Sequence, residues 1–195
     1  KGTLTAAQVA AYVAAGLGRA APGVKTVEVP VADGGDGTVD AAEASGYRRV
    51  DIGVRGPTGK PVDASFALLD GTAIIESAQA CGLTRLPGGT LAPLTATSRG
   101  VGELILAAVR MRAKLIVLGL GGSACTDGGA GLVTALGGRL LDASGTELPP
   151  GGAVLARLDH IDVSQLRDLS GTATEFIVAT DVDNPLLGPC GAAAV

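Results

Sequence analysis

The stretch LIVLGLGGSACTDGGAG, Leu115–Gly131, joins an apolar run to a loop with many glycines and one carboxylate, Asp127. The aliphatic residues 115–118 are typical of a buried strand. Glycine has no Cβ, so such a loop lets backbone N–H groups come close to a phosphate. A loop that is merely flexible has the same composition, so both interpretations stand at this point. A strand, a glycine-rich loop and a helix in this order predict an α/β protein.

Two further apolar runs are followed by loops of the same kind. VPVA precedes DGGDG (residues 33–37), and FIVAT precedes DVDNP (residues 181–185). In α/β sheets ligands bind at the carboxyl ends of strands, so we expect Asp33, Asp127 and Asp181 to meet at one edge. Carboxylates hold Mg²⁺ and accept the proton of a hydroxyl group, while bare amides hold phosphate. The pattern predicts metal-dependent phosphoryl transfer.

A purely structural interpretation of the same acidic residues is also open. Asp127 precedes a predicted helix, where aspartate is a common N-cap. Asp33 and Asp36 are common turn formers, and Asp181 with Asn184 before a proline is typical of an Asx turn. No Walker A lysine follows the glycines. The coincidence of three such loops favours the functional interpretation.

The rest of the chain predicts helices and strands in alternation, with one antiparallel section. Thr5 and Gln8 have the spacing of a capping box ahead of a helix. The alternation of valines in residues 27–31 predicts a strand, and residues 175–180 predict a further buried strand. Short strands joined by tight turns are predicted at residues 48–54, 62–69 and 72–76.

We therefore expect an open, mostly parallel sheet with helices on both faces, of the Rossmann or flavodoxin type, plus a smaller α/β lobe with antiparallel strands. In domain terms, residues 1–50 belong to a first α/β domain, and residues 51–195 form a second lobe with antiparallel strands and glycine-rich loops. The chain begins without methionine and stops inside an unfinished element, so we expect it to be incomplete at both ends.

Composition argues against several classes of protein. The 195 residues carry a formal net charge of −4 with no cluster of Lys and Arg, which argues against a nucleic-acid binder. No apolar run approaches the roughly 18–20 residues of a membrane helix. Cys81, Cys125 and Cys190 are far apart in the sequence and are expected to be free thiols of a reducing compartment. The single histidine, His160, is expected at the surface.

Four strings in this chain closely resemble, in order and spacing, the motifs of the bacterial glycerate kinase family: VADGGDGTVDA, TSRGVGELI, GLGGSACTDGGAG and DVDNPLLGP. The opening KGTLTA resembles the end of that family's N-terminal D-S-F-K-G segment, so the resemblance covers essentially the whole chain. It implies an α/β enzyme of two lobes that transfers the γ-phosphoryl group of ATP to D-glycerate, with 2-phosphoglycerate favoured over 3-phosphoglycerate. It also implies the cofactors ATP and Mg²⁺, a cytoplasmic location, no membrane or nucleic-acid partner, and compatibility with a homo-oligomer.

The resemblance assigns roles to residues that match these motifs. The implied catalytic residues are Asp181, Asp127 and Lys1, and the implied metal ligands are Asp181 and Asp127. The implied nucleotide-binding residues are Gly121, Gly122, Ser123 and Gly128. The implied substrate-binding residues are Asp33, Gly34, Gly35, Ser98, Arg99 and Asn184. Which of the carboxylates is the base and which holds the metal stays open, and Asp36 stands where family members usually have glutamate.

Three alternatives compete with this interpretation. GLGGSA resembles the G-L-G-S-S-A loop of the GHMP-type small-molecule kinases, but the other three strings would then have no explanation. A non-catalytic sensor of sugar acids or phosphate on the same fold would not need Asp33, Asp127 and Asp181. A bare structural module would not need charges at strand ends.

Overall fold

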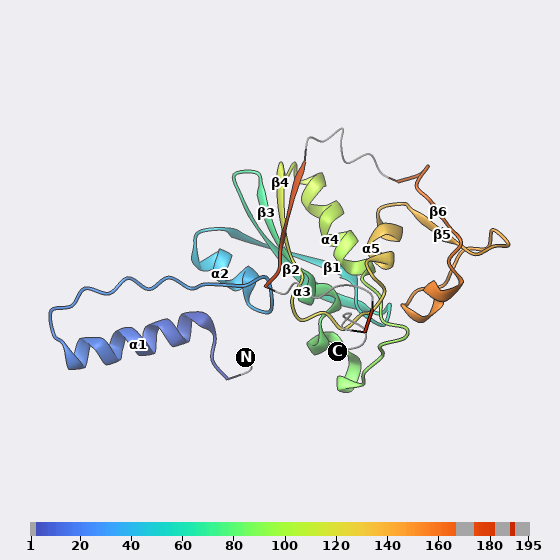
Figure 1. Ribbon diagram of the computed structural model, residues 1–195. Helices are drawn as coiled ribbons and strands as arrows, with labels where there is room; N and C mark the ends of the chain where they lie inside the picture. The colour runs from blue at the N-terminus through green and yellow to red at the C-terminus, as the bar shows by residue number, and fades with distance from the viewer. Residues whose placement is uncertain (1–2, 167–173, 182–187, 190–195) are drawn as a thin grey trace.

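The structure, a computed structural model, describes residues 3–166, 174–181 and 188–189. Its main feature is a five-stranded open sheet with the strand order β1-β2-β3-β4-β7. Helices pack against this sheet, and a small second sheet lies beside it (Figure 1). The α/β fold predicted from the sequence is therefore confirmed.

The first three strands form an antiparallel meander. They are β1 (Arg48–Arg55), β2 (Pro61–Leu69) and β3 (Thr72–Glu76). The β2–β3 turn places Asp70 and Gly71 at φ 46 and 80, as the Asp-Gly pair of a tight hairpin turn requires. The antiparallel prediction is confirmed, and these strands belong to the same sheet as the parallel strands. β3 continues directly into the parallel part of the same sheet.

The parallel part consists of β3, β4 (Leu115–Gly119) and β7 (Glu175–Ala179), with Glu76, Gly119 and Ala179 side by side at the carboxyl end. The sheet is thus mixed, with two parallel and two antiparallel pairings, and not mostly parallel. β7 was expected to be buried. It pairs only with β4 among the described strands, and Phe176 and Val178 are 44% and 55% exposed because β7 lies at the edge.

The core lies between one face of the sheet and α4 (Arg99–Arg110). Leu104 and Ile105 of this helix pack with Phe66, Ile75 and Ile116 of three strands, and all five are at most 2% exposed. Helix α2 (Thr38–Ala44) contacts β1, β2 and β3 from the other side (Figure 1). The core is aliphatic, as the low aromatic content requires.

The remaining elements surround this core. They are α3 (Ser77–Cys81), α5 (Ala130–Ala135), the 3₁₀ turns η1 (Leu83–Arg85), η2 (Pro87–Gly89) and η3 (Ala153–Arg157), and the second sheet of β5 (Arg139–Leu141) and β6 (His160–Asp162). α5 contacts both α4 and β5, which ties the small sheet to the core. None of the helices in the described ranges has the length and apolar character needed to cross a membrane.

Residues 4–32 form an arm that projects from the body (Figure 1). The arm contains α1 (Ala6–Ala20), which begins with the predicted capping box of Thr5 and Gln8 but buries none of its residues. The strand predicted at residues 27–31 does not form, and Val27 and Val31 are 87% and 77% exposed. A strand needs a hydrogen-bonding neighbour, and this segment pairs with no strand in the part of the chain that the structure describes.

Candidate functional site

Two glycine-rich loops pack directly on each other where β3, β4 and β7 end. The amide of Gly121 donates to the carbonyl of Gly34 at 3.1 Å. A Cβ on Gly119 would lie 2.3 Å from the Gly34 carbonyl oxygen, and a Cβ on Gly34 would lie 2.5 Å from that of Ala179. These glycines therefore permit close contact between the loops and the strand ends. Of the residues predicted from the sequence, Gly34, Gly35 and Gly121 are brought together here.

Two amides in the second loop point to a ligand. The backbone N–H groups of Gly122 and Ser123 find no hydrogen-bond acceptor among the residues that the structure describes, and both residues are exposed. Gly122 has φ 74, a conformation that favours glycine. Adjacent free amides in a left-handed turn form the kind of concave site that binds anions. Gly128, also predicted to bind nucleotide, is exposed with φ 57.

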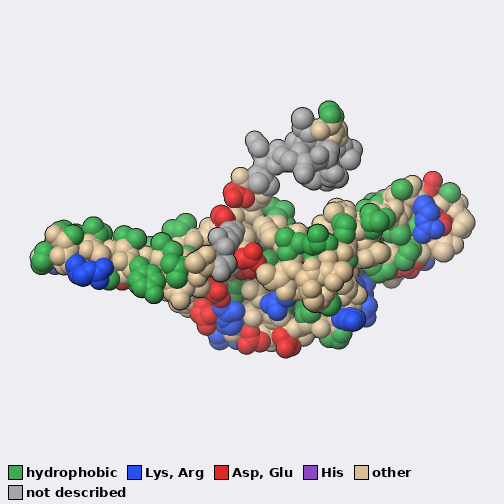
Figure 2. All heavy atoms as spheres, turned by 90° about the horizontal axis from the view of Figure 1, so that it is seen from below, with side chains coloured by type: hydrophobic (Ala, Val, Ile, Leu, Met, Phe, Trp, Pro, Cys, Tyr) green, Lys and Arg blue, Asp and Glu red, His purple; other side chains and the backbone are tan. Residues whose placement is uncertain are grey.

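Exposed carboxylates surround this edge of the sheet. Asp33 and Asp36 lie in the first loop, Asp181 follows β7 by two residues, and all three are exposed. A Cβ on Gly122 would lie 3.1 Å from Oδ2 of Asp36, so this carboxylate is next to the free amides. Asp33 and Asp36 line a cavity of about 510 Å³ between α2 and the arm. Figure 2 shows acidic side chains gathered where the arm meets the body.

A buried carboxylate that the sequence analysis did not select, Glu76, stands at the same edge. It is the last residue of β3, it is 2% exposed, and its Oε2 accepts from the amide of Val39 in the first turn of α2 at 3.1 Å. Burial raises the pKa of the Glu76 carboxyl, and the nearby carboxylates of Asp36 and Asp40 act in the same direction, while backbone amides oppose them. The signal was in the sequence, because TAIIE is a fourth apolar run that ends in a carboxylate.

Asp127 has a different environment from the other carboxylates. It is 1% exposed, and its Oδ2 accepts from the amide and hydroxyl of Ser98 at 2.8 and 3.0 Å and from the amide of Gly131 at 3.0 Å. Its Oδ1 accepts from the amide of Gly129 at 3.2 Å. Asp127 therefore joins the loop before α4 to the first turn of α5, while the N-cap position of α5 itself is Gly129.

Ser98 and Arg99 lie with Asp127 and not with Asp33. The hydroxyl of Ser98 also accepts from the amide of Leu132 at 3.0 Å, so this side chain is fully used inside the protein. The Arg99 guanidinium lies 3.5 Å from Glu103 and lines a small cavity of about 110 Å³ beside Thr134. Its buried Nε has no hydrogen-bond partner in the described residues.

The predicted site residues thus fall into two groups plus a remainder. Asp33, Gly34, Gly35, Gly121, Gly122 and Asp181 belong to the edge formed by β3, β4 and β7, whereas Ser98, Arg99 and Asp127 belong to the contact between α4 and α5. The loop of residues 120–129 connects the two groups. Lys1 and Asn184 lie outside the described residues.

The described residues contain no preformed cluster of metal ligands. The described ranges contain no group of three or more His, Cys, Asp and Glu side chains that could hold a metal ion. Mg²⁺ is usually held by one or two carboxylates, with phosphate oxygens and water completing its shell. The exposed carboxylates of Asp36 and Asp181 fit that requirement, and the buried Asp127 fits it poorly.

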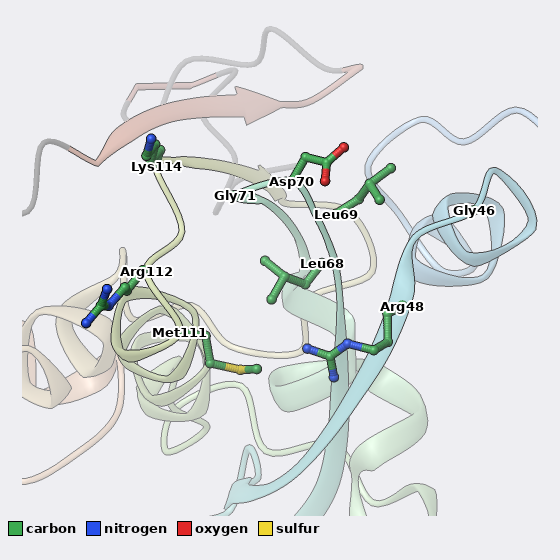
Figure 3. A pocket seen from close by; sticks show the side chains of 9 residues that line it. All are labelled: Gly46, Arg48, Leu68, Leu69, Asp70, Gly71, Met111, Arg112 and Lys114. Carbon is green, nitrogen blue, oxygen red and sulfur yellow. The ribbon is translucent and has the colours of Figure 1, made fainter.

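Another hollow, of about 540 Å³, lies at the opposite end of the sheet (Figure 3). Three cationic side chains border it together with Asp70: Arg48 at the start of β1, and Arg112 and Lys114 in the connection between α4 and β4. Gly71 and Lys114, which also line it, directly precede β3 and β4. The hollow is therefore far from the glycine-rich loops, which follow the carboxyl ends of these strands.

Comparison with known proteins gives a consistent picture over the whole chain. The family model described as "Glycerate kinase family" matches residues 1–195. A glycerate kinase from Bacillus subtilis is 48% identical, and a glycerate 2-kinase from Escherichia coli is 46% identical, each over 100% of this chain. A crystal structure from Salmonella typhimurium LT2, whose protein is assigned as glycerate kinase 2, superposes with a TM-score of 0.84 at 44% identity and covers 98% of this chain. The chain spans about half of each of these relatives: 52% of the two curated proteins and 53% of the solved chain.

Fold and site together define an α/β protein that gathers glycine-rich loops and carboxylates at the carboxyl ends of its strands. Within that class, the chain belongs to the glycerate kinase family. This confirms the resemblance drawn from the four sequence strings. The GHMP-type alternative is not needed to explain the glycine-rich loop.

Proposed function

We propose that this chain carries the phosphate-binding loop of an ATP-dependent kinase, and that the whole protein phosphorylates D-glycerate to 2-phosphoglycerate. The observation that carries the proposal is the pair of free, exposed amides of Gly122 and Ser123 beside the carboxylate of Asp36. Anionic ligands bind to such amides, but a carboxylate next to a phosphate needs a cation between them. ATP with Mg²⁺ satisfies both conditions. The names of the relatives support the choice of glycerate as substrate.

The two groups of residues have different proposed tasks. The amides of Gly122 and Ser123 hold phosphate oxygens, and the carboxylates of Asp36 and Asp181 hold Mg²⁺, which supplies positive charge to the transferred phosphoryl group. Asp181 is also our candidate for the base that accepts the proton of the glycerate hydroxyl. Asp33 and its loop, with Lys1 and Asn184, stay predicted contacts of the substrate or phosphate.

Asp127 was predicted as a catalytic or metal-binding residue, and its burial supports a positioning role instead. Its four hydrogen bonds hold the segment before α4 against the start of α5, which fixes the end of the glycine-rich loop. Arg99, the first residue of α4, lines the small cavity beside Thr134. If Arg99 binds the glycerate carboxylate, this cavity is therefore the acid-binding pocket.

Further parts of the proposal concern the whole protein. We place it in the cytoplasm, as a two-lobed α/β enzyme of Rossmann or flavodoxin type with the domain boundary near residue 50. A homo-oligomer is compatible with it, and no nucleic-acid or membrane partner is needed. The described thiols of Cys81 and Cys125 are free, which supports a reducing compartment.

The direct test is an ADP-release assay on the full-length protein with D-glycerate, L-glycerate and related hydroxy acids as acceptors. D-Glycerate should give the highest kcat/KM, and phosphorus NMR should identify the product as 2-phosphoglycerate. A protein that binds D-glycerate or phosphate without releasing ADP would instead be a non-catalytic sensor.

Variants connect this activity to the edge of the sheet. Asp181→Asn and Asp36→Asn keep the shape of the side chain but remove its charge, so each should lower kcat by about 100-fold or more. Asp63→Asn is the matched control, because Asp63 is an exposed aspartate on β2 without an ion pair among the described residues. Near-normal turnover of both Asp181→Asn and Asp36→Asn would contradict the assignment.

A further inference from the structure

Two cysteines face each other across the base of the glycine-rich loop. Cys81 is the last residue of α3, and Cys125 lies in the loop that follows β4. Their sulfur atoms are 3.8 Å apart, and the hydroxyl of Ser123 lies 3.5 Å from Sγ of Cys81 and 3.1 Å from Sγ of Cys125. Nothing in the proposed phosphoryl transfer uses these thiols, although they adjoin the amides that we assign to phosphate.

The backbone already holds the two segments together. The amide of Ala124 donates to the carbonyl of Cys81 at 2.8 Å, and the amide of Leu83 donates to the carbonyl of Gly122 at 3.1 Å. These bonds form an isolated antiparallel bridge between Gly82 and Ser123. A disulfide bond is about 2.05 Å long, so the sulfur atoms need to approach by about 1.8 Å. The exposed loop on the Cys125 side can move by this amount more easily than the buried end of α3.

The two thiols differ in access to solvent. Cys81 is 1% exposed, whereas Cys125 is only partly buried. A small oxidant therefore reaches Cys125 first, and Cys81 is the neighbouring thiol that completes the reaction. Such a pair of an accessible cysteine and an adjacent resolving cysteine is the usual arrangement at reversible oxidation sites.

We propose that Cys81 and Cys125 are a reversible disulfide site, oxidised by a hydroperoxide, that fixes the glycine-rich loop to α3. The Cys125 thiolate attacks the O–O bond of hydrogen peroxide, forms a sulfenic acid and releases hydroxide. The Cys81 sulfur then attacks the Cys125 sulfur, the S–O bond breaks, and the Cys81 proton leaves with the expelled hydroxide as water. Two thiols and one peroxide give one disulfide and two waters, so the sulfurs lose two electrons and the peroxide gains them. A dithiol reverses the reaction by exchange.

The disulfide alters the loop that contains the free amides. The hydroxyl of Ser123 lies beside both sulfurs, and Ser123 precedes Cys125 by two residues in the same loop. Movement of Cys125 toward Cys81 therefore pulls on this loop and shifts the nearby amides of Gly122 and Ser123. This consequence rests on the proposed function, because it matters to activity only if these amides bind phosphate. The expected effect is a rise in the KM for ATP of about 5-fold or more in the oxidised protein.

The first experiment detects the bond itself and does not depend on activity. The full-length protein is treated with a small molar excess of hydrogen peroxide, blocked with an alkylating reagent, and digested with trypsin. A disulfide between Cys81 and Cys125 links the tryptic peptides of residues 56–85 and 115–139. We expect this linked pair in the wild type and in Cys190→Ser, its loss in Cys81→Ser and Cys125→Ser, and its disappearance after dithiothreitol. Oxidation of Cys125 to sulfinic acid without the linked pair would overturn the proposal.

The second experiment measures the kinetics of the same samples. Oxidised wild type and Cys190→Ser should show the raised KM for ATP, dithiothreitol should restore it, and Cys81→Ser should not respond in this way. An unchanged KM in protein that contains the linked peptides would overturn the effect on the loop. A reduced protein without kinase activity would contradict the proposed function, while the peptide measurement would still decide whether the disulfide forms.

Discussion

At the scale of single residues, the carboxylates at this site differ mainly in how much water they meet. Asp36 and Asp181 are exposed, whereas Asp127 and Glu76 are at most 2% exposed and accept hydrogen bonds from backbone amides. A buried carboxylate that satisfies several donors stabilises local structure, and it has few lone pairs left for a metal. The chemistry that we propose therefore belongs to the exposed members of the set.

This distinction predicts the effect of Asp127→Asn on stability. The asparagine oxygen can replace one carboxylate oxygen, but its NH₂ group then faces backbone donors that have lost their acceptor. We expect a loss of about 2–4 kcal/mol in the free energy of unfolding, measured by urea denaturation. Asp63→Asn is the control and should change the stability by less than about 0.5 kcal/mol. Equal urea midpoints for the wild type and Asp127→Asn would show that these hydrogen bonds do not hold α4 and α5 together.

A second residue-scale prediction concerns Glu76 and pH. Burial raises the pKa of this carboxyl above its ordinary value of 4.5, so the folded protein holds the proton more tightly than the unfolded chain does. The resulting stabilisation is fully present below pH 4.5 and is lost as the pH rises through the folded pKa. Glu76→Gln does not titrate and keeps an oxygen for the amide of Val39.

The melting temperature of Glu76→Gln relative to the wild type should therefore increase from about pH 4 to about pH 8. Each unit of pKa difference corresponds to about 1.4 kcal/mol. Melting curves that stay parallel across the whole pH range would contradict the burial argument.

At the scale of elements, the sequence predicted the turns and helix ends that depend on residues adjacent in the chain. It did not predict which distant strands pair with each other. The hairpin strands β1, β2 and β3 follow from tight turns such as Asp70-Gly71, and α1 follows from its capping box. That β3 pairs with β4 depends on the crossover through α4, which no local pattern records. For this reason the sequence pattern did not predict that the meander joins the parallel strands in one sheet, and the strand predicted at residues 27–31 does not form.

The site shows the same division. The loop that follows β4, the loop that begins at Asp33, and the position of Asp181 after β7 were predicted from the sequence because each follows an apolar run. The separation of Ser98 and Arg99 from Asp33 was not predicted, since it depends on the packing of α4 against α5. The role of Gly34 and Gly119 as contact points between two loops also appears only in three dimensions.

The contact between these loops predicts a specific pair of variants. A Cβ on Gly119 would lie 2.3 Å from the Gly34 carbonyl oxygen, a backbone atom that cannot rotate away. Gly119→Ala should therefore push the loops apart and lower the free energy of unfolding by about 1–3 kcal/mol. Gly53→Ala is the matched control in β1, because no atom lies within 4 Å of the position that its methyl group would occupy. It should be neutral or stabilising by up to about 1 kcal/mol, and equal losses in both variants, measured in urea, would exclude loop contact as the cause.

At the scale of the whole molecule, the body and the arm differ in how they are held. The body has one core between the sheet and α4, whereas α1 has no buried residue and Val27 and Val31 are mostly exposed. Segments with few buried contacts open at little free-energy cost, and cleavage by a protease requires such local opening. The arm is therefore the part of this chain that a protease should reach most easily.

Trypsin should cut the 195-residue chain after Arg19 and Lys25 before it cuts after Arg48, Arg112 or Lys114, because only the first two lie in the arm. Mass spectrometry of a short digestion should show an early product that begins at Thr26 and keeps the β1–β4 region intact. Replacing both arm sites with glutamine should delay the first cut in the described part of the chain without changing the urea midpoint, since neither side chain packs in the core. Simultaneous cutting at Lys25 and Lys114 would mean that the body opens as readily as the arm, and the stable core assigned to the sheet and α4 would then be wrong.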